Sequence, residues 1–365
     1  MVCAANIAAA KDAAHPRARW TEQQANDWYA KQPWLVGSDY IPSYAINQLE
    51  MWQADTFNPN RIDRELGWAQ SLGFTTMRVF LHDLLWEQDP DGFKKRIDTF
   101  LTICAKHHIR PLFVFFDSCW DPNPHLGKQH APVPGVHNSG WVQSPGASAL
   151  ADPAQYPRLE AYVKGIIGAF GSDERVLGWD LWNEPDNDGG GNYAKEEAKN
   201  KTALVLALLP KVYDWVREAG ATQPLTSGVW NGNWGDDAKL SPMEKIQLSE
   251  SDIVSFHSYE KPAVFEERIQ SLEHFHRPII CTEYMARKNG STFEGSLPIA
   301  KKYHVGAINW GFVAGKTQTY YPWDSWQHPY VDHQPAMWFH DIFHADGKPY
   351  SEQEVAFIRK IIKGS

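Results

Sequence analysis

Short apolar runs alternate along the chain with longer segments whose apolar residues recur at helical spacing. The runs are rich in β-branched and aromatic residues and cover 34–37, 75–81, 111–116, 176–182, 224–230, 252–257, 278–283 and 306–311. Continuous apolar runs of this length are typical of strands that are buried on both faces. The pattern therefore predicts eight strands that belong to a parallel sheet.

The segments between these runs are predicted to be helices. Asn58 followed by Pro59 is a start signal for a helix over 59–72. In 91–108 one apolar stripe is formed by Phe93, Ile97, Phe100, Leu101 and Cys104. Further helices are expected over 156–170, 195–219, 263–274, 297–303 and 352–362, with a weaker signal over 241–248.

Eight strand–helix units in a chain of 365 residues predict a single (β/α)8 barrel. We assign the barrel to 31–365 and a leading segment, which includes a helix, to 1–30. An open, doubly wound sheet is the alternative, but neither a G-x-G-x-x-G motif nor a P-loop follows the first run. In a barrel the chemistry lies at the carboxyl ends of the strands, so polar residues at those positions are candidate site residues.

Reading the end of each predicted strand yields one set of candidates. They are Arg78, Asp117, Asn183, Glu184, Trp230, His257, Tyr259, Glu283 and Trp310. Glu184 and Glu283 end the fourth and seventh strands, which lie across the barrel from each other. Two facing carboxyl groups are the apparatus of glycoside hydrolysis, in which one protonates the leaving oxygen and the other attacks the anomeric carbon or activates water.

The charges around the two glutamates predict different pKa values. We expect Arg78 to keep the pKa of Glu283 low and the second negative charge to raise the pKa of Glu184. The pH dependence of kcat/KM should then be bell-shaped, with an acidic limb from Glu283 and a basic limb from Glu184.

Four short motifs carry a resemblance to a known family. The stretches 77-MRVF-80, 181-LWNEP-185, 257-HSY-259 and 280-ICTEY-284 resemble clan A glycoside hydrolases of the family 5 type, the cellulase and mannanase relatives. The resemblance implies that Glu184 is the acid/base, that Glu283 is the nucleophile, and that Asn183 binds the 2-hydroxyl of the sugar. It also implies that Tyr259 bonds to the nucleophile and His257 supports the acid/base.

The same resemblance gives Arg78 the task of keeping the nucleophile ionised and makes Trp310 the floor of the subsite where the bond breaks. Two stretches depart from the usual family 5 sequence, 37-GSDYIPS-43 and 116-FDSCWDP-122. They indicate a divergent member of the family or a separate family of the clan.

Aromatic residues gather in two long loops, 117–152 and 313–339, and the chain has 17 Trp in all. Flat sugar faces stack on aromatic rings, so loop aromatics near a carboxyl pair fit a carbohydrate cleft. Candidate substrate contacts in these loops are Asp117, Trp120, His137, Trp323 and Trp326, beside Trp230 and Trp310 at strand ends. A lid of this kind would close one end of the cleft and favour exo action.

Composition excludes several classes of partner. The net charge is −9 and no basic run is present, which argues against nucleic acid and anionic membranes. No window approaches the apolar length of a membrane span. The four cysteines show no zinc spacing, and 107-HH-108 and 274-HFH-276 follow helices, so no metal or other cofactor is expected.

The Ala-rich stretch 1–14 is compatible with the tail of a trimmed signal peptide, although it lacks a basic n-region and a full apolar h-region; mainly the function predicted below favours a secreted or periplasmic protein. The predicted function is a retaining hydrolase of a β-linked polysaccharide or oligosaccharide, by default an endo-β-1,4-glucanase or mannanase. An exo-acting β-glycosidase is the nearest alternative. A non-catalytic carbohydrate-binding barrel is the alternative from another class, and it would lack one of the two carboxylates.

Overall fold

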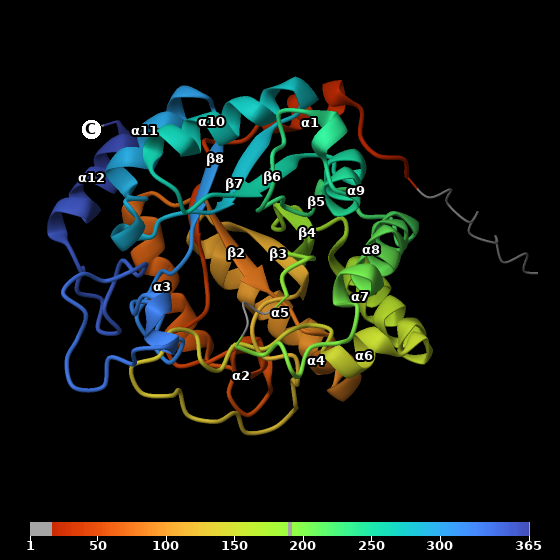
Figure 1. Ribbon diagram of the computed structural model, residues 1–365, viewed down its shortest axis with the longest axis horizontal. Coiled ribbons are helices and arrows are strands. Elements are labelled where there is room, and N and C mark those ends of the chain that lie inside the picture. Colours follow the sequence, from red (N-terminus) through yellow and green to blue (C-terminus); the bar gives the residue numbers. More distant parts are fainter. Residues whose placement is uncertain (1–16, 189–191, 365) are drawn as a thin grey trace, which may run out of the picture.

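Eight parallel strands form a nearly closed barrel in the computed structural model, which describes residues 17–188 and 192–364 (Figure 1). The strands are β1 Val36–Asp39, β2 Thr76–Phe80, β3 Arg110–Asp117, β4 Gly178–Asn183, β5 Leu225–Thr226, β6 Val254–His257, β7 Ile279–Glu283 and β8 Gly306–Asn309. Hydrogen-bonded neighbours follow the order β5-β4-β3-β2-β1-β8-β7-β6. A parallel bridge between Val229 and Phe256 joins the two ends of the sheet. The predicted strands and the (β/α)8 barrel are confirmed.

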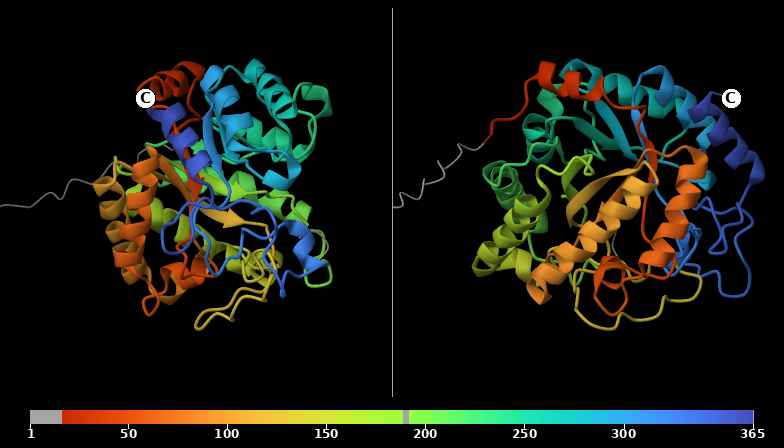
Figure 2. Two further views of the ribbon diagram at one scale, coloured as in Figure 1. Left: turned by 90° about the vertical axis from the view of Figure 1, so that its left-hand side faces the viewer. Right: turned by 180° about the vertical axis from the view of Figure 1, so that it is seen from behind.

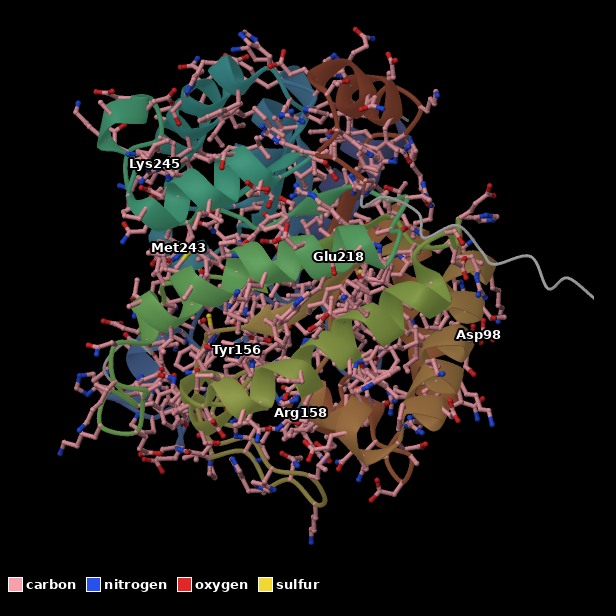
Figure 3. All side chains as sticks on the ribbon, turned by 90° about the vertical axis from the view of Figure 1, so that its right-hand side faces the viewer. Asp98, Tyr156, Arg158, Glu218, Met243 and Lys245 are labelled. Atoms are coloured by element: carbon pink, nitrogen blue, oxygen red, sulfur yellow. The ribbon has the colours of Figure 1, made fainter. Side chains whose placement is uncertain are left out.

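Helices surround the barrel on its outside (Figures 1 and 2). They are α1 Glu22–Tyr29, α2 Gln48–Trp52, α3 Pro59–Leu72, α4 Asp83–Gln88, α5 Pro90–Lys106, α6 Ala147–Ala151, α7 Tyr156–Phe170, α8 Lys201–Glu218, α9 Pro242–Glu250, α10 Pro262–Leu272, α11 Phe293–Lys302 and α12 Glu352–Lys363. Short 3-10 turns are η1 Pro153–Gln155, η3 Asp237–Lys239, η4 Glu273–Phe275, η5 Arg287–Asn289 and η6 Trp323–Trp326. Figure 3 shows α7, α8 and α9 side by side, with charged side chains such as Glu218 on their outer surface.

Local signals explain where the helices begin. The Asn58 side chain accepts a hydrogen bond from the backbone N–H of Arg61, and Gly73, at φ 94°, ends α3 in the left-handed conformation. The weak segment 241–248 is helical because Ser241 and Glu244 form a capping box. The prediction that α8 starts at 195 is wrong, since Asn200 has φ 58° and the helix begins only after it.

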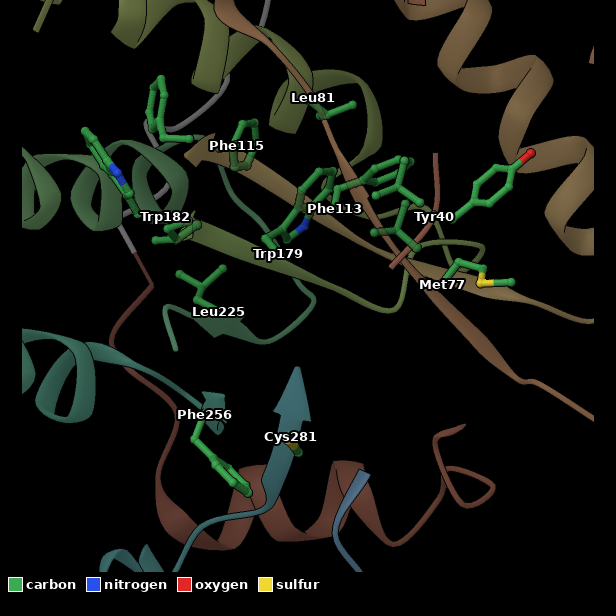
Figure 4. Packing of buried hydrophobic residues seen from close by; sticks show 14 of the residues in the cluster. Tyr40, Met77, Leu81, Phe113, Phe115, Trp179, Trp182, Leu225, Phe256 and Cys281 are labelled. Carbon is green, nitrogen blue, oxygen red and sulfur yellow. The ribbon is translucent and has the colours of Figure 1, made fainter. Parts of the chain in front are cut away.

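Aromatic residues of β3 and β4 pack between the barrel and its helices (Figure 4). The rings of Phe113 and Phe115 stack on Trp179 at centroid distances of 5.8 and 5.3 Å. Inside the barrel, the amino-terminal end is filled by a separate apolar cluster of Leu35, Leu112, Leu177, Ile253, Ile280 and Ile308 with Ala25 of α1. The polar side chains inside the barrel therefore lie toward the carboxyl end of the strands.

The predicted signal remnant, 1–14, lies outside the described residues. Within residues 17–188 and 192–364, no helix has both the length and the apolar character that crossing a membrane requires.

Candidate active site

Glu184 and Glu283 face each other at the carboxyl end of the barrel. Glu283 is the last residue of β7, and Glu184 follows the last residue of β4. One carboxylate oxygen of each lies within 4.8 Å of the other and of a ring nitrogen of His257. Both residues are buried, with 9% and 5% of their surface exposed. The predicted juxtaposition of the two carboxyl groups across the barrel is thus present.

The backbone of Glu184 has φ 41°, in the left-handed region that residues other than glycine rarely adopt. Such a conformation costs on the order of 1–3 kcal/mol and is held only where surrounding structure enforces it. Here the β4 ladder fixes Asn183 on one side, and Pro185 follows on the other. The strained turn directs the Glu184 carboxylate toward the cavity rather than along the strand.

A fully buried arginine, Arg78 of β2, holds Glu283. Its Nη1 lies 2.9 Å from Oε1 of Glu283 and 2.9 Å from Oδ1 of Asp39, and its Nη2 lies 2.8 Å from Oδ2 of Asp180. The hydroxyl of Tyr259 donates to Oε2 of Glu283 at 2.6 Å. Three buried carboxyl groups therefore share one guanidinium, and the predicted contacts of Arg78 and Tyr259 with Glu283 are both formed.

The expected low pKa of Glu283 is wrong in direction. Burial raises its pKa above the usual value, and the nearby charge of Glu184 adds to this, although His257, Arg78 and the Tyr259 hydroxyl oppose the shift. The physical reason is that the charge of Arg78 is divided among Asp39, Asp180 and Glu283, so it compensates burial only in part.

Neutral groups surround Glu184. Nδ1 of His257 lies 2.9 Å from Oε1, and the Asn187 amide donates to Oε2 at 2.7 Å. The thiol of Cys119 lies 3.3 Å from the same Oε2. Burial raises the pKa of Cys119 well above its usual value and lowers the pKa of His257 to about 4, so both are uncharged at neutral pH.

The pKa of Glu184 is raised, as predicted, but the cause differs from the predicted one. Burial is the largest cause, and the hydrogen bonds from Asn187 and Cys119 oppose it. A carboxyl group in this environment favours its protonated form, which a general acid requires.

Asn183 and Asp117 connect the carboxyl pair to the wall of the cavity. Nη2 of Arg78 donates to the side-chain oxygen of Asn183 at 2.7 Å, and the Asn183 amide donates to Asp117 at 2.9 Å. The indole N–H of Trp141 donates to the other oxygen of Asp117 at 2.6 Å. Burial raises the pKa of Asp117 to about 6. Asp117, predicted as a substrate contact, therefore also orients two neighbouring side chains.

A cavity of about 570 Å³ lies over the carboxyl pair, in the size range of ligand sites. Its lining contains eleven of the predicted residues, Asp117, Trp120, His137, Asn183, Glu184, Trp230, Tyr259, Glu283, Trp310, Trp323 and Trp326. The two remaining ones, Arg78 and His257, are buried and contact the glutamates.

Several residues of the site were not predicted. Asp39, Asp180, Cys119 and Asn187 contact the residues described above, and Trp141 lines the cavity. A signal existed for two of them: Asp180 is a charge inside an apolar run, and Cys119 comes two residues after the end of a strand. Asn187 and Trp141 lie in loops whose path the sequence pattern does not define.

Glu184, His257 and Glu283 together offer three atoms that could ligate one metal ion. However, the guanidinium of Arg78 contacts Glu283 at 2.9 Å and would repel a cation there. The electrostatics of the set favour acid–base chemistry by the side chains themselves.

Comparisons with known proteins agree with this geometry. The family model described as Cellulase (glycosyl hydrolase family 5) matches residues 133–328, more than half of the chain. The chain belongs to glycosyl hydrolase family 5. The predicted family is confirmed, and with it the class of glycoside hydrolases. A comparison with curated protein sequences found no match.

Solved structures similar to this family 5 chain include the exo-beta-1,4-mannosidase from Opitutaceae bacterium strain TAV5, with 18% identity and a TM-score of 0.59. That match covers 90% of this chain but only 59% of the mannosidase, which is the longer protein. The endo-1,4-beta-mannanase from Rhizomucor miehei matches with 13% identity and a TM-score of 0.57, over 90% of this chain and 97% of its own.

A GH5_18 protein from Streptomyces cattleya, solved in complex with Manb1-4GlcNAc, matches with 11% identity and a TM-score of 0.56. The match covers 91% of this chain and 80% of that one. At such identities the likeness concerns the fold.

Proposed function

We propose that this family 5 chain is a retaining β-glycosidase in which Glu283 is the nucleophile and Glu184 the acid/base. The observation that carries the proposal is the separation of the two carboxyl groups, with one oxygen of each within 4.8 Å. Retaining enzymes hold their carboxyl groups about 5–5.5 Å apart, whereas inverting enzymes need about 6.5–9.5 Å to admit a water molecule.

The proposed reaction proceeds in two steps. Glu283 attacks the anomeric carbon while Glu184 donates its proton to the departing glycosidic oxygen, and a covalent glycosyl-enzyme forms. Glu184, now ionised, then removes a proton from water, which attacks the same carbon and releases Glu283. The Asn187 amide and the Cys119 thiol, at 2.7 and 3.3 Å from Oε2, stabilise Glu184 while it is ionised.

We further propose that the substrate is a β-1,4-linked glycan that contains mannose or glucose, or an oligosaccharide from one. The family description and the mannose-directed structural neighbours support this class. The aromatic lining of the cavity supports stacking on sugar rings. Export from the cell stays a prediction from the sequence.

The test is a panel of β-mannans, β-glucans, xylans, galactans and aryl β-glycosides, with proton NMR of the first product. Wild-type protein should release the β anomer first, and Glu184→Gln and Glu283→Gln should each remove the activity on glycans. An α anomer as the first product would rule out retention. Glycan binding without turnover on any substrate would instead favour a carbohydrate-binding barrel.

A further inference from the structure

We propose that the loops after β3 and β8 join to close one end of the cavity, so that the enzyme removes single sugar units from the non-reducing ends of β-linked chains. The inference rests on the proposed function and adds its mode of action. The two loops lie on the same side of the barrel in Figures 1 and 2, drawn in yellow and blue. The contacts between residues 133–138 and residues 317–330 form a seam between the two loops.

Backbone hydrogen bonds hold the seam together. The N–H of Asn138 donates to the carbonyl of Thr317 at 2.8 Å, and the N–H of Tyr330 donates to that of Gly135 at 2.9 Å. Gly135 has φ +73°, and a Cβ there would lie 2.4 Å from the backbone of Tyr330. Only glycine permits this approach of the two loops.

The side chain of Gln318 reinforces the seam from the β8 loop. Its amide donates to the carbonyls of Val133 and Val136 at 2.7 and 3.0 Å, and its oxygen accepts from the N–H of Gly135 at 3.3 Å. Gln318 is buried, so these bonds are protected from water. The closure is therefore a built part of the fold rather than a contact between two loose loops.

Residues that line the cavity are part of the same closure. The backbone N–H of His137 donates to the hydroxyl of Ser325 at 2.9 Å. The ring Nδ1 of His137 bonds to the carbonyl of Tyr321 at 2.8 Å. Trp120 and Trp326 stack across the loops, with 5.2 Å between ring centroids and 11° between planes. These rings form a wall over the cavity.

Trp141 and Trp310 line both the cavity and a second void behind it. The second void, lined by the same two tryptophans together with Tyr40, Phe80 and Phe312, measures only about 10 Å³. That volume holds about one water molecule and no sugar ring. This void therefore has no room for a further sugar unit behind Trp141 and Trp310.

The opposite side of the cavity is the side of the leaving group. Trp230, which follows β5, lines it there, and its indole N–H donates to Asp186, two residues from the proposed acid Glu184, at 2.6 Å. The connection between β6 and α10 on this side is short, residues 258–261. The acid must lie beside the departing oxygen, so the rest of the chain leaves on this side and the closed end receives the terminal unit.

The closed end also offers a hydrogen-bond donor. Within the described residues, the indole Nε1 of Trp326 is buried and has no hydrogen-bond partner. Trp326 lines the cavity, so a hydroxyl of a terminal sugar can accept this bond. A chain that continued past this point would meet the seam.

The test uses β-1,4-linked manno- and cello-oligosaccharides of defined length, labelled at the reducing end, with aryl β-glycosides assayed in parallel. The expected early products are a single sugar and a labelled chain one unit shorter. Labelled products of mixed length from the wild-type protein would overturn the exo mode while leaving the proposed function intact. Absence of hydrolysis of every aryl glycoside and oligosaccharide would overturn both.

Gly135→Ala should open the seam, and Gly127→Ala is its matched control. Both glycines have positive φ in the same loop, at +73° and +88°, but a Cβ at Gly127 meets nothing within 4 Å. Gly135→Ala should raise the rate of internal cleavage of polysaccharide by about tenfold over the wild type and the control. The loss of viscosity of the polysaccharide solution measures this rate. Gln318→Ala replaces it if circular dichroism shows that Gly135→Ala is unfolded. An unchanged product pattern in a folded seam variant would overturn the role of the seam.

Discussion

The two sides of the site bury a carboxyl group equally well but surround it with different charges. Glu283 contacts the guanidinium of Arg78 at 2.9 Å, whereas the groups bonded to Glu184 are His257, Asn187 and Cys119, all uncharged at neutral pH. Burial raises both pKa values. Burial therefore sets the common direction of the two shifts, and the fixed cation beside Glu283 is the charge that distinguishes the two roles.

Because the two groups interact, their protons are lost in steps that belong to the pair. We propose that the first proton leaves the group on Arg78, since its negative charge is the one compensated. Glu283 is then ionised while Glu184 keeps its proton, which is the state that the first reaction step requires.

The largest expected effects come from the glutamates themselves. Glu283→Gln should lower kcat/KM by about 10³-fold or more for every leaving group, because no covalent intermediate can form. Glu184→Gln should cost about 10²–10⁴-fold for sugar leaving groups but far less for nitrophenyl groups, which depart without a proton. Measuring kcat/KM for aryl glycosides of graded leaving-group pKa checks this. If kcat/KM depended equally on the leaving-group pKa in both variants, the assignment of Glu184 as acid and Glu283 as nucleophile would be contradicted.

Removing the cation should affect both activity and stability. Arg78→Met leaves Asp39, Asp180 and Glu283 without a compensating charge, so we expect kcat/KM to fall about 10²-fold and the acidic limb to move to higher pH. The free energy of unfolding should fall by about 3–5 kcal/mol.

Arg158→Met is the control for Arg78→Met. Arg158, labelled in Figure 3, pairs with buried Asp83 at 2.7 Å, and neither residue lines the cavity. This variant should lose stability in urea titrations but keep the wild-type pH profile. A shifted profile in the control would show that general destabilisation explains the effect at Arg78.

Asp117 is a further buried carboxyl group, which no cation contacts among residues 17–188 and 192–364, and it should make stability depend on pH. Its folded pKa is about 6 against an ordinary value of 3.8. Between these values the folded chain keeps a proton that the unfolded chain has released, so the free energy of unfolding falls as pH rises through this window. The loss is on the order of 1–3 kcal/mol.

Urea titrations across pH 4 to 7 measure this dependence. In Asp117→Asn, the free energy of unfolding should depend less on pH below about pH 6. The dependence that remains should come from the other carboxyl groups whose pKa burial raises, among them Glu184, Glu283 and Asp341, the last with a pKa of about 7. A variant curve parallel to that of the wild type would exclude Asp117 as a source.

The smallest effect is expected at Cys119. Its thiol stabilises the ionised form of Glu184, so Cys119→Ala should raise the pKa of Glu184 and move the basic limb of kcat/KM upward by about half a pH unit. Cys119→Ser keeps a donor and should leave the limb in place. Both pH profiles are needed, and a limb that moves equally in both variants would assign the effect to packing.

Local patterns in the sequence were sufficient for the barrel and its catalytic candidates. Strands buried on both faces appear as apolar runs whatever their neighbours are, and the end of such a run marks the carboxyl edge of the barrel. Glu184 and Glu283 could therefore be found without knowing any contact. The limits of α3 were predictable as well, because Asn58 and Gly73 act on adjacent backbone.

Tertiary structure decided what depends on several residues meeting from distant parts of the chain. The pKa of Glu283 follows from how β1, β2 and β4 bring Asp39, Arg78 and Asp180 together, and no one of these strands contains that information. The seam likewise joins Gly135 to Tyr330, nearly two hundred residues apart. Burial and charge compensation are sums over neighbours in space, so sequence determined which side chains were available and the fold determined how each of them ionises and what it encloses.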